Sequence, residues 1–63
     1  MNLQQNLKRL EVLSKTYCLG KVEGTITTPK IGTGEYYAYA NGMTYLANSI
    51  NEAVTYAIDT ISI

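Results

Sequence analysis

Apolar side chains recur at helical spacing through the first eighteen residues of the chain. At about 100° per residue they fall on one side of a helix, and the opposite side is polar. The pattern predicts an amphipathic helix from about Asn2 to Cys18, with Gly20 as its C-terminal stop. The apolar stripe comprises Leu3, Leu7, Leu10, Leu13, Tyr17 and Cys18.

The spacing changes to a period of two between Lys21 and Thr28. This alternation predicts a half-buried strand, with Val22 and Ile26 directed into the core. Pro29 should end the strand because it has no backbone N–H to donate. Residues 29–34 then form a glycine-containing loop.

Two tyrosine-rich runs flank Asn41-Gly42, the pair best suited to a two-residue type I′ hairpin turn. Such a turn fixes the register, with Ala40 opposite Met43 and Tyr37 opposite Leu46. We assign the alanine-rich face to the core, because small side chains let helices approach closely. That face carries Tyr36, Ala38, Ala40, Met43, Tyr45 and Ala47, and the outward face carries Tyr37, Tyr39, Thr44 and Leu46.

A capping box, Ser49-Ile50-Asn51-Glu52, follows the second run directly. The Ser49 hydroxyl accepts a backbone N–H in this motif, and Glu52 reaches back to the cap residue. Apolar residues then return to helical spacing. The pattern predicts a second amphipathic helix from Ile50 to about Ile61.

These elements predict one α+β domain over residues 1–63, in the order α-β-β-β-α. The three strands should form an antiparallel meander, with both amphipathic helices packed on one face. In element order and length the chain resembles the double-stranded RNA-binding domain. That family has a lysine cluster at the start of its second helix and a Gly-Pro-x-His segment. This chain has Asn48-Ser49-Ile50-Asn51-Glu52 at the first place and no histidine, so the resemblance implies the topology and not the RNA-binding residues.

Composition limits the chemistry that 63 residues can support. The single cysteine, Cys18, cannot form an intrachain disulfide, and the absence of histidine leaves too few ligands for a structural zinc site. The carboxylates are dispersed along the chain. We therefore expect no catalytic residue, no metal site, no cofactor and no enzymatic activity. No apolar run approaches the ~20 residues of a membrane span, and the lone thiol fits a cytoplasmic protein without membrane contact.

Nucleic-acid binding is the first alternative function. All five basic residues lie in the first thirty positions and could form a basic end, and exposed tyrosines can stack on bases. The net charge is zero, whereas dedicated nucleic-acid binders show a basic excess. We do not favour this reading. Its contact residues would be Lys8, Arg9, Lys15, Lys21 and Lys30.

Protein binding is the function that the pattern favours. The outward face, with Tyr37, Tyr39, Thr44 and Leu46, offers aromatic contact area with polar tips. A chain this short has a marginal core, so burial against another protein or a second copy, as a homodimer, is expected. Small, uncharged, non-catalytic phage and mobile-element inhibitors of bacterial defence, including anti-CRISPR proteins, are similar in type. A second alternative is a nucleotide-binding sponge, in which the tyrosines stack on a base and Lys21 or Lys30 binds phosphate.

Overall fold

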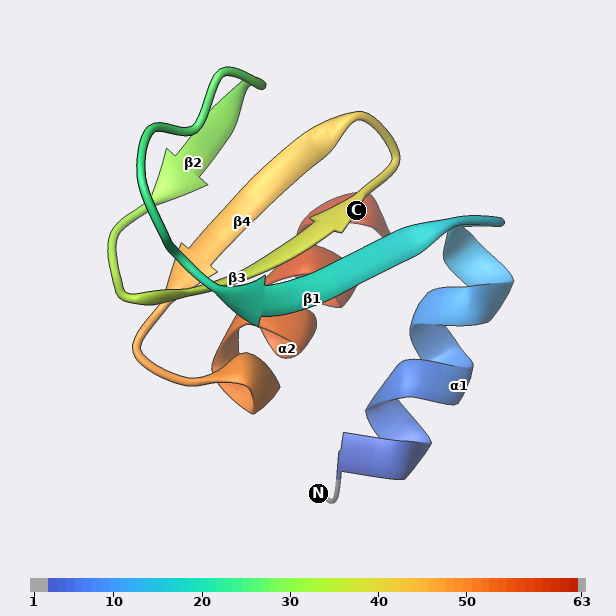
Figure 1. Ribbon diagram of the computed structural model, residues 1–63. Helices are drawn as coiled ribbons and strands as arrows, with labels where there is room; N and C mark the ends of the chain where they lie inside the picture. Colours follow the sequence, from blue (N-terminus) through green and yellow to red (C-terminus); the bar gives the residue numbers. More distant parts are fainter. Residues whose placement is uncertain (1–2, 63) are drawn as a thin grey trace.

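The computed structural model describes residues 3–62 and contains two helices and a four-stranded sheet (Figure 1). The sheet has one face covered by the helices and an opposite face, here called the outer face, that carries none (Figure 1). The elements in chain order are α1 (Leu3–Leu13), β1 (Tyr17–Lys21), β2 (Lys30–Gly32), β3 (Tyr36–Ala40), β4 (Met43–Ala47) and α2 (Ile50–Ile61).

The predicted α+β class is confirmed, whereas the three-stranded antiparallel meander is only partly right. The strand order is β1-β3-β4-β2, with β1, β3 and β4 antiparallel. β1 lies at one edge of the sheet, and β2 lies at the opposite edge, where it runs parallel to β4. The sheet is therefore mixed, and the strand arrangement expected from the double-stranded RNA-binding resemblance does not hold.

The predicted hairpin is confirmed residue by residue. Ala40 lies opposite Met43 and Tyr37 opposite Leu46. Asn41 and Gly42 both adopt positive φ, 53° and 83°, as a type I′ turn requires. The alanine-rich face lies against the helices, as expected. Its most buried members are Ala38, Ala40 and Tyr45.

The second helix also begins and ends where the sequence predicts. The Ser49 side chain accepts the Glu52 backbone N–H at 3.1 Å, which satisfies one of the free donors of the first turn. At the other end, the Ser62 backbone N–H donates to the Ile58 carbonyl. α2 packs across β3 and β4.

The first helix is shorter than predicted, because it ends at Leu13 and not at Cys18. The predicted start at Asn2 lies outside the described residues. Tyr17 and Cys18 fit the helical stripe, but they belong to β1 and pair with β3. Gly20, expected to stop the helix, is a strand residue opposite Tyr37.

The predicted strand from Lys21 to Thr28 is wrong. Only Lys21 of this range is in a strand, because residues 17–20 already pair with the edge of β3. Residues 22–29 form an irregular connection, here called the crossover segment, which runs from β1 at one sheet edge to β2 at the other (Figure 1). The predicted loop 29–34 contains β2.

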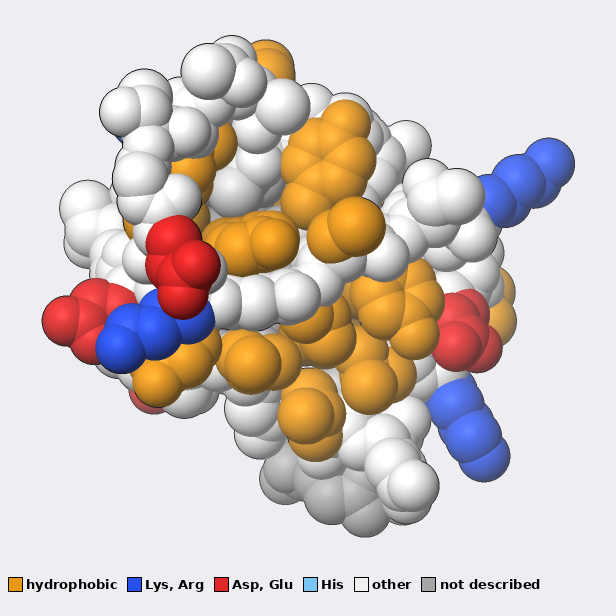
Figure 2. Space-filling model, in the orientation of Figure 1, with side chains coloured by type: hydrophobic (Ala, Val, Ile, Leu, Met, Phe, Trp, Pro, Cys, Tyr) orange, Lys and Arg blue, Asp and Glu red, His pale blue; other side chains and the backbone are white. Residues whose placement is uncertain are grey.

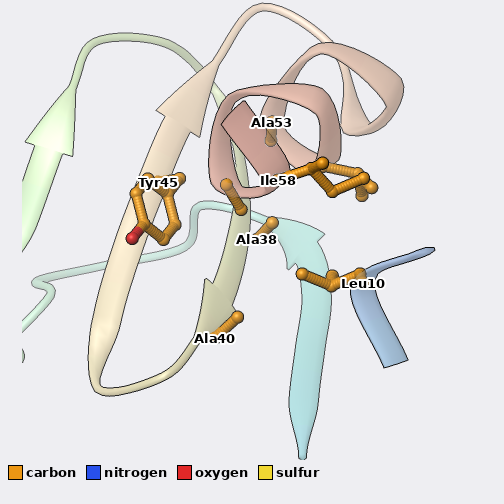
Figure 3. Close-up of a cluster of buried hydrophobic side chains, with 8 residues drawn as sticks. Leu10, Ala38, Ala40, Tyr45, Ala53 and Ile58 are labelled. Carbon is orange, nitrogen blue, oxygen red and sulfur yellow. The ribbon is translucent and has the colours of Figure 1, made fainter. Parts of the chain in front are cut away.

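The core lies between the helices and the sheet (Figure 3). Leu10 is its one buried residue from α1, and Tyr45 packs edge-on against Tyr56 with ring centroids 5.4 Å apart. Burial raises the pKa of the Tyr45 phenol, and the nearby Tyr56 raises it further. Among the described residues, four of the eight buried apolar side chains are alanines, so the core is small: Leu10, Ala38, Ala40, Tyr45, Ala53, Val54, Ala57 and Ile58.

A buried polar contact joins the two helices. Asn6 of α1 is 1% exposed, and its amide donates to the Asn51 side-chain oxygen at 2.7 Å and to the Thr55 hydroxyl at 3.3 Å. The Asn6 side-chain oxygen has no hydrogen-bond partner in the part of the chain that the structure describes. α1 packs mainly against α2 and makes few contacts with the strands.

Candidate functional site

The outer face of the sheet positions the residues of the candidate site in two rows. Register places Cys18 of β1 beside Tyr39 of β3, and Tyr39 beside Thr44 of β4. Because side chains alternate across a strand, these residues share the face opposite the core residue Ala38. The second row comprises Gly20, Tyr37 and Leu46.

The second row depends on a close approach of Tyr37 to Gly20. A Cβ atom added to Gly20 would lie 3.1 Å from the Tyr37 ring. The missing side chain therefore lets the ring lie close to β1. This contact fixes the position of Tyr37 on the outer face.

The crossover segment is tied to the sheet at both ends. The Val22 N–H donates to the Glu35 carbonyl at 2.7 Å, and the Thr44 N–H donates to the Pro29 carbonyl at 2.9 Å. The Thr28 and Thr44 hydroxyls also share a hydrogen bond of 2.8 Å. Between these anchors the segment forms a wall beside the two outer tyrosines.

The sheet and the crossover segment together border an open hollow of about 490 Å³. Its surface is mainly apolar and aromatic, and Figure 2 shows apolar side chains inside a depression on this face. Lys21 and Glu23 contribute opposite charges to its lining. The lining residues are Cys18, Lys21, Val22, Glu23, Ile26, Thr27, Thr28, Tyr37, Tyr39 and Thr44.

The four residues predicted for protein binding occupy different positions on this face. Tyr37 and Tyr39 are half-buried and line the hollow. Thr44 is only 3% exposed, because it bonds to the crossover segment, so it supports the hollow and offers little surface to a partner. Leu46 is half-buried and is not part of the lining.

Six of the ten lining residues are not among the predicted site residues, and the sequence pattern places three of these six elsewhere. Val22 and Ile26 were expected in the core, but both line the hollow on the opposite face. Cys18 was expected in a buried helical stripe, but it is exposed on β1. The alternation of Tyr17 and Leu19 with Cys18 was the available signal, since it fits a strand as well as a helix.

The five basic residues do not gather on one element. Lys8 and Arg9 belong to α1, and Lys15 lies in the connection to β1. Lys21 ends β1 and lines the hollow, whereas Lys30 begins β2 at the opposite sheet edge.

The basic first half of the chain does not form a separate end of the molecule. α1 packs against α2, and β1 pairs with β3, so basic and acidic stretches of the sequence are interleaved. Among the described residues, no three cysteine or acidic side chains are grouped so that they could hold a metal ion.

Searches against protein-family models, curated proteins and solved structures give no match to this chain. Neither of the two described helices has the length and apolar character needed to cross a membrane. The functional reading therefore rests on the outer face itself.

Proposed function

We propose that this chain is a non-enzymatic binding module that captures a protein partner through the hollow on its outer face. The observation that carries the proposal is the pairing of Tyr37 and Tyr39 in an open, mainly apolar hollow of about 490 Å³. Two aromatic rings held on a sheet offer large contact area and lose little conformational entropy on binding. The occupant we infer is an apolar or aromatic side chain that projects from the partner's surface.

The crossover segment supports this choice of occupant. Val22 and Ile26 add aliphatic surface to the lining that contains the tyrosines, so an inserted side chain would contact apolar groups of both the sheet and the crossover segment. Lys21 and Glu23 lie in the same lining and can bond to polar groups around the insertion. Binding of this kind is stoichiometric, and it inhibits a partner when the covered surface is the one the partner uses.

The test compares one position inside the hollow with one outside it in a binding assay. Tagged protein is used to capture a partner, which is then titrated against the wild type, Tyr39→Ser and Val12→Ser. Val12 is 86% exposed on α1 and is not in the hollow, so its replacement is the matched control. We expect one-to-one binding, unchanged in Val12→Ser and weakened at least about tenfold in Tyr39→Ser, equivalent to about 1.4 kcal/mol.

Circular dichroism establishes that both variants are folded. A folded Tyr39→Ser variant that binds with full affinity would refute the site. Equal weakening by Val12→Ser would also refute it, since the contact surface would then include α1.

One observation favours a second candidate, a nucleotide-like ligand. Lys21 lines the same hollow as Tyr37 and Tyr39, and the hollow is within the size range of small-molecule sites, roughly 300–1,000 Å³. The tyrosines would stack on a base, and Lys21 would bond to phosphate. This candidate predicts that purified protein retains a ligand with excess ultraviolet absorbance, and that Lys21→Ala loses it. Protein that is free of such absorbance and does not bind added nucleotides would exclude it.

A further inference from the structure

β1 lies at the edge of the sheet, and one side of this strand has no neighbouring strand among residues 3–62. The Val22 N–H donates to the carbonyl of Glu35, the residue just before β3, so it points towards β3. Backbone groups of successive residues point to opposite edges of an antiparallel strand, so Cys18 and Gly20 also direct theirs towards β3. The N–H and C=O groups of Tyr17, Leu19 and Lys21 are therefore directed to the free edge.

The side chains of Tyr17 and Leu19 lie on the helix-covered face, whereas Lys21, at the end of the strand, also lines the outer-face hollow. Register puts Leu19 opposite the core residue Ala38, and Tyr17 and Leu19 both pack against the core while staying half exposed. The Tyr17 hydroxyl donates to the Glu11 carboxylate of α1 at 3.1 Å. This hydrogen bond, with smaller contributions from desolvation and the Glu11 charge, raises the Tyr17 pKa.

α1 adds apolar surface beside this edge. Figure 1 shows α1 on the side of β1 away from β3, and Figure 2 shows apolar side chains gathered over both elements. Leu7 is half-buried and Leu3 is 36% exposed. The free edge thus combines backbone hydrogen-bonding groups with adjacent apolar side chains that the fold leaves partly uncovered.

We propose that the free edge of β1 binds an extended segment of a partner protein as a fifth strand. The segment's backbone would pair with Tyr17, Leu19 and Lys21, and its apolar side chains, at alternate positions, would face α1. The free edge shares only Lys21 with the lining of the outer-face hollow, and it uses the backbone of that residue, so the proposal does not depend on the function proposed above.

A second copy of the chain fits this edge poorly. Pairing β1 with its symmetry mate would put two strands about 4.8 Å apart, whereas two packed helices need about 8–10 Å between their axes. Each copy has α1 on the free side of β1, so both helices would compete for the same space (Figure 1). A single added strand brings no second helix to this edge.

The probe is a capped hexapeptide of alternating lysine and isoleucine, which has one apolar face and remains soluble. Residue-resolved hydrogen exchange is measured on the full chain with and without it. When nine-tenths of the protein molecules have peptide bound, exchange of the Leu19 amide should slow about tenfold, because only the protein without peptide exchanges. The Gly20 amide, already bonded to β3, should change little. A peptide N-methylated at its isoleucines keeps the side chains but loses the donors that face β1, and should have no effect.

Lys21 offers a matched pair of variants. Lys21→Pro removes an N–H that faces the free edge, a position where an edge strand tolerates proline, whereas Lys21→Ala keeps the N–H. We expect both variants to stay folded, and peptide protection of Leu19 to be lost only in Lys21→Pro. Tyr39→Ser should leave this protection unchanged.

Three results would overturn the proposal. The first is an unfolded Lys21→Pro variant, because the N–H would then be needed within the sheet. The second is an unchanged Leu19 exchange rate at saturating peptide, or equal protection by the N-methylated peptide. The third is a dimer that only Lys21→Pro converts to monomer, which would make a second copy the occupant of this edge.

Discussion

At the scale of single residues, two glycines with positive φ differ in what surrounds them. Gly34, between β2 and β3, has φ of 151°, and a Cβ atom there would overlap the backbone carbonyl of Ala47. Gly42, in the hairpin turn, has φ of 83° and open space around it. Adding a side chain therefore costs conformational free energy at both positions, because φ is positive at both. It causes a steric overlap only at Gly34.

These environments predict different costs for the same substitution. Gly42→Ala should lower the free energy of unfolding by about 1–2 kcal/mol, the cost of a left-handed conformation with a side chain. Gly34→Ala should cost about 3 kcal/mol or more, because β4 must also move. Urea unfolding followed by circular dichroism measures both. Equal losses would mean that the loop before β3 moves away from Ala47 at little cost.

At the scale of elements, the sequence predicts those whose signals are local. Asn41-Gly42 fixes the hairpin and its register within a few residues, and Ser49 fixes the start of α2. The ends of α1 and β1 depend on a distant partner, because Tyr17 and Cys18 suit a helical stripe until β3 offers its edge. The parallel pairing of β2 with β4 has no local signal at all.

The candidate site divides in the same way. Tyr37 and Tyr39 follow from the hairpin register, so their shared face could be predicted. The hollow could not be predicted, because its wall is the crossover segment. The position of this segment depends on which sheet edges β1 and β2 occupy.

The contact between α1 and α2 supports a prediction about Asn6. Asn6→Asp would put a carboxylate at a 1% exposed position beside the Asn51 oxygen and remove the amide donor. We expect a loss of about 2–4 kcal/mol at neutral pH. Burial raises the pKa of the introduced carboxyl above its unfolded value of about 4. The loss should therefore be complete above the folded-state pKa and disappear as the pH falls towards 4.

Asn6→Leu is the matched control, because it keeps a similar volume and adds no charge. It should cost less than about 1.5 kcal/mol and show no such pH dependence, since it also removes the unpaired Asn6 oxygen. Urea titrations at several pH values compare the two variants. A pH-independent loss in Asn6→Asp would mean that the carboxylate reaches solvent and that α1 is not held against α2 at this point.

At the scale of the whole molecule, the small core makes association energetically important. Within residues 3–62, half of the buried apolar side chains are alanines, and each alanine contributes little buried area. A domain of this size rarely gains more than about 3–5 kcal/mol from its own core. Covering the half-buried tyrosines of the outer face would add apolar burial that the single chain lacks.

We therefore expect a homodimer through the outer face when no partner is present. Size-exclusion chromatography with light scattering should give twice the 7.0 kDa chain mass, and the thermal midpoint should rise with protein concentration. Tyr39→Lys places charges across this interface and should yield a monomer with a concentration-independent midpoint, whereas Val12→Ser should remain dimeric. A wild-type monomer at about 100 μM, well above a micromolar dissociation constant, would contradict self-association and leave the outer face free for a foreign protein. Because the chain has no tryptophan, absorbance recorded in the same run would also reveal a bound nucleotide.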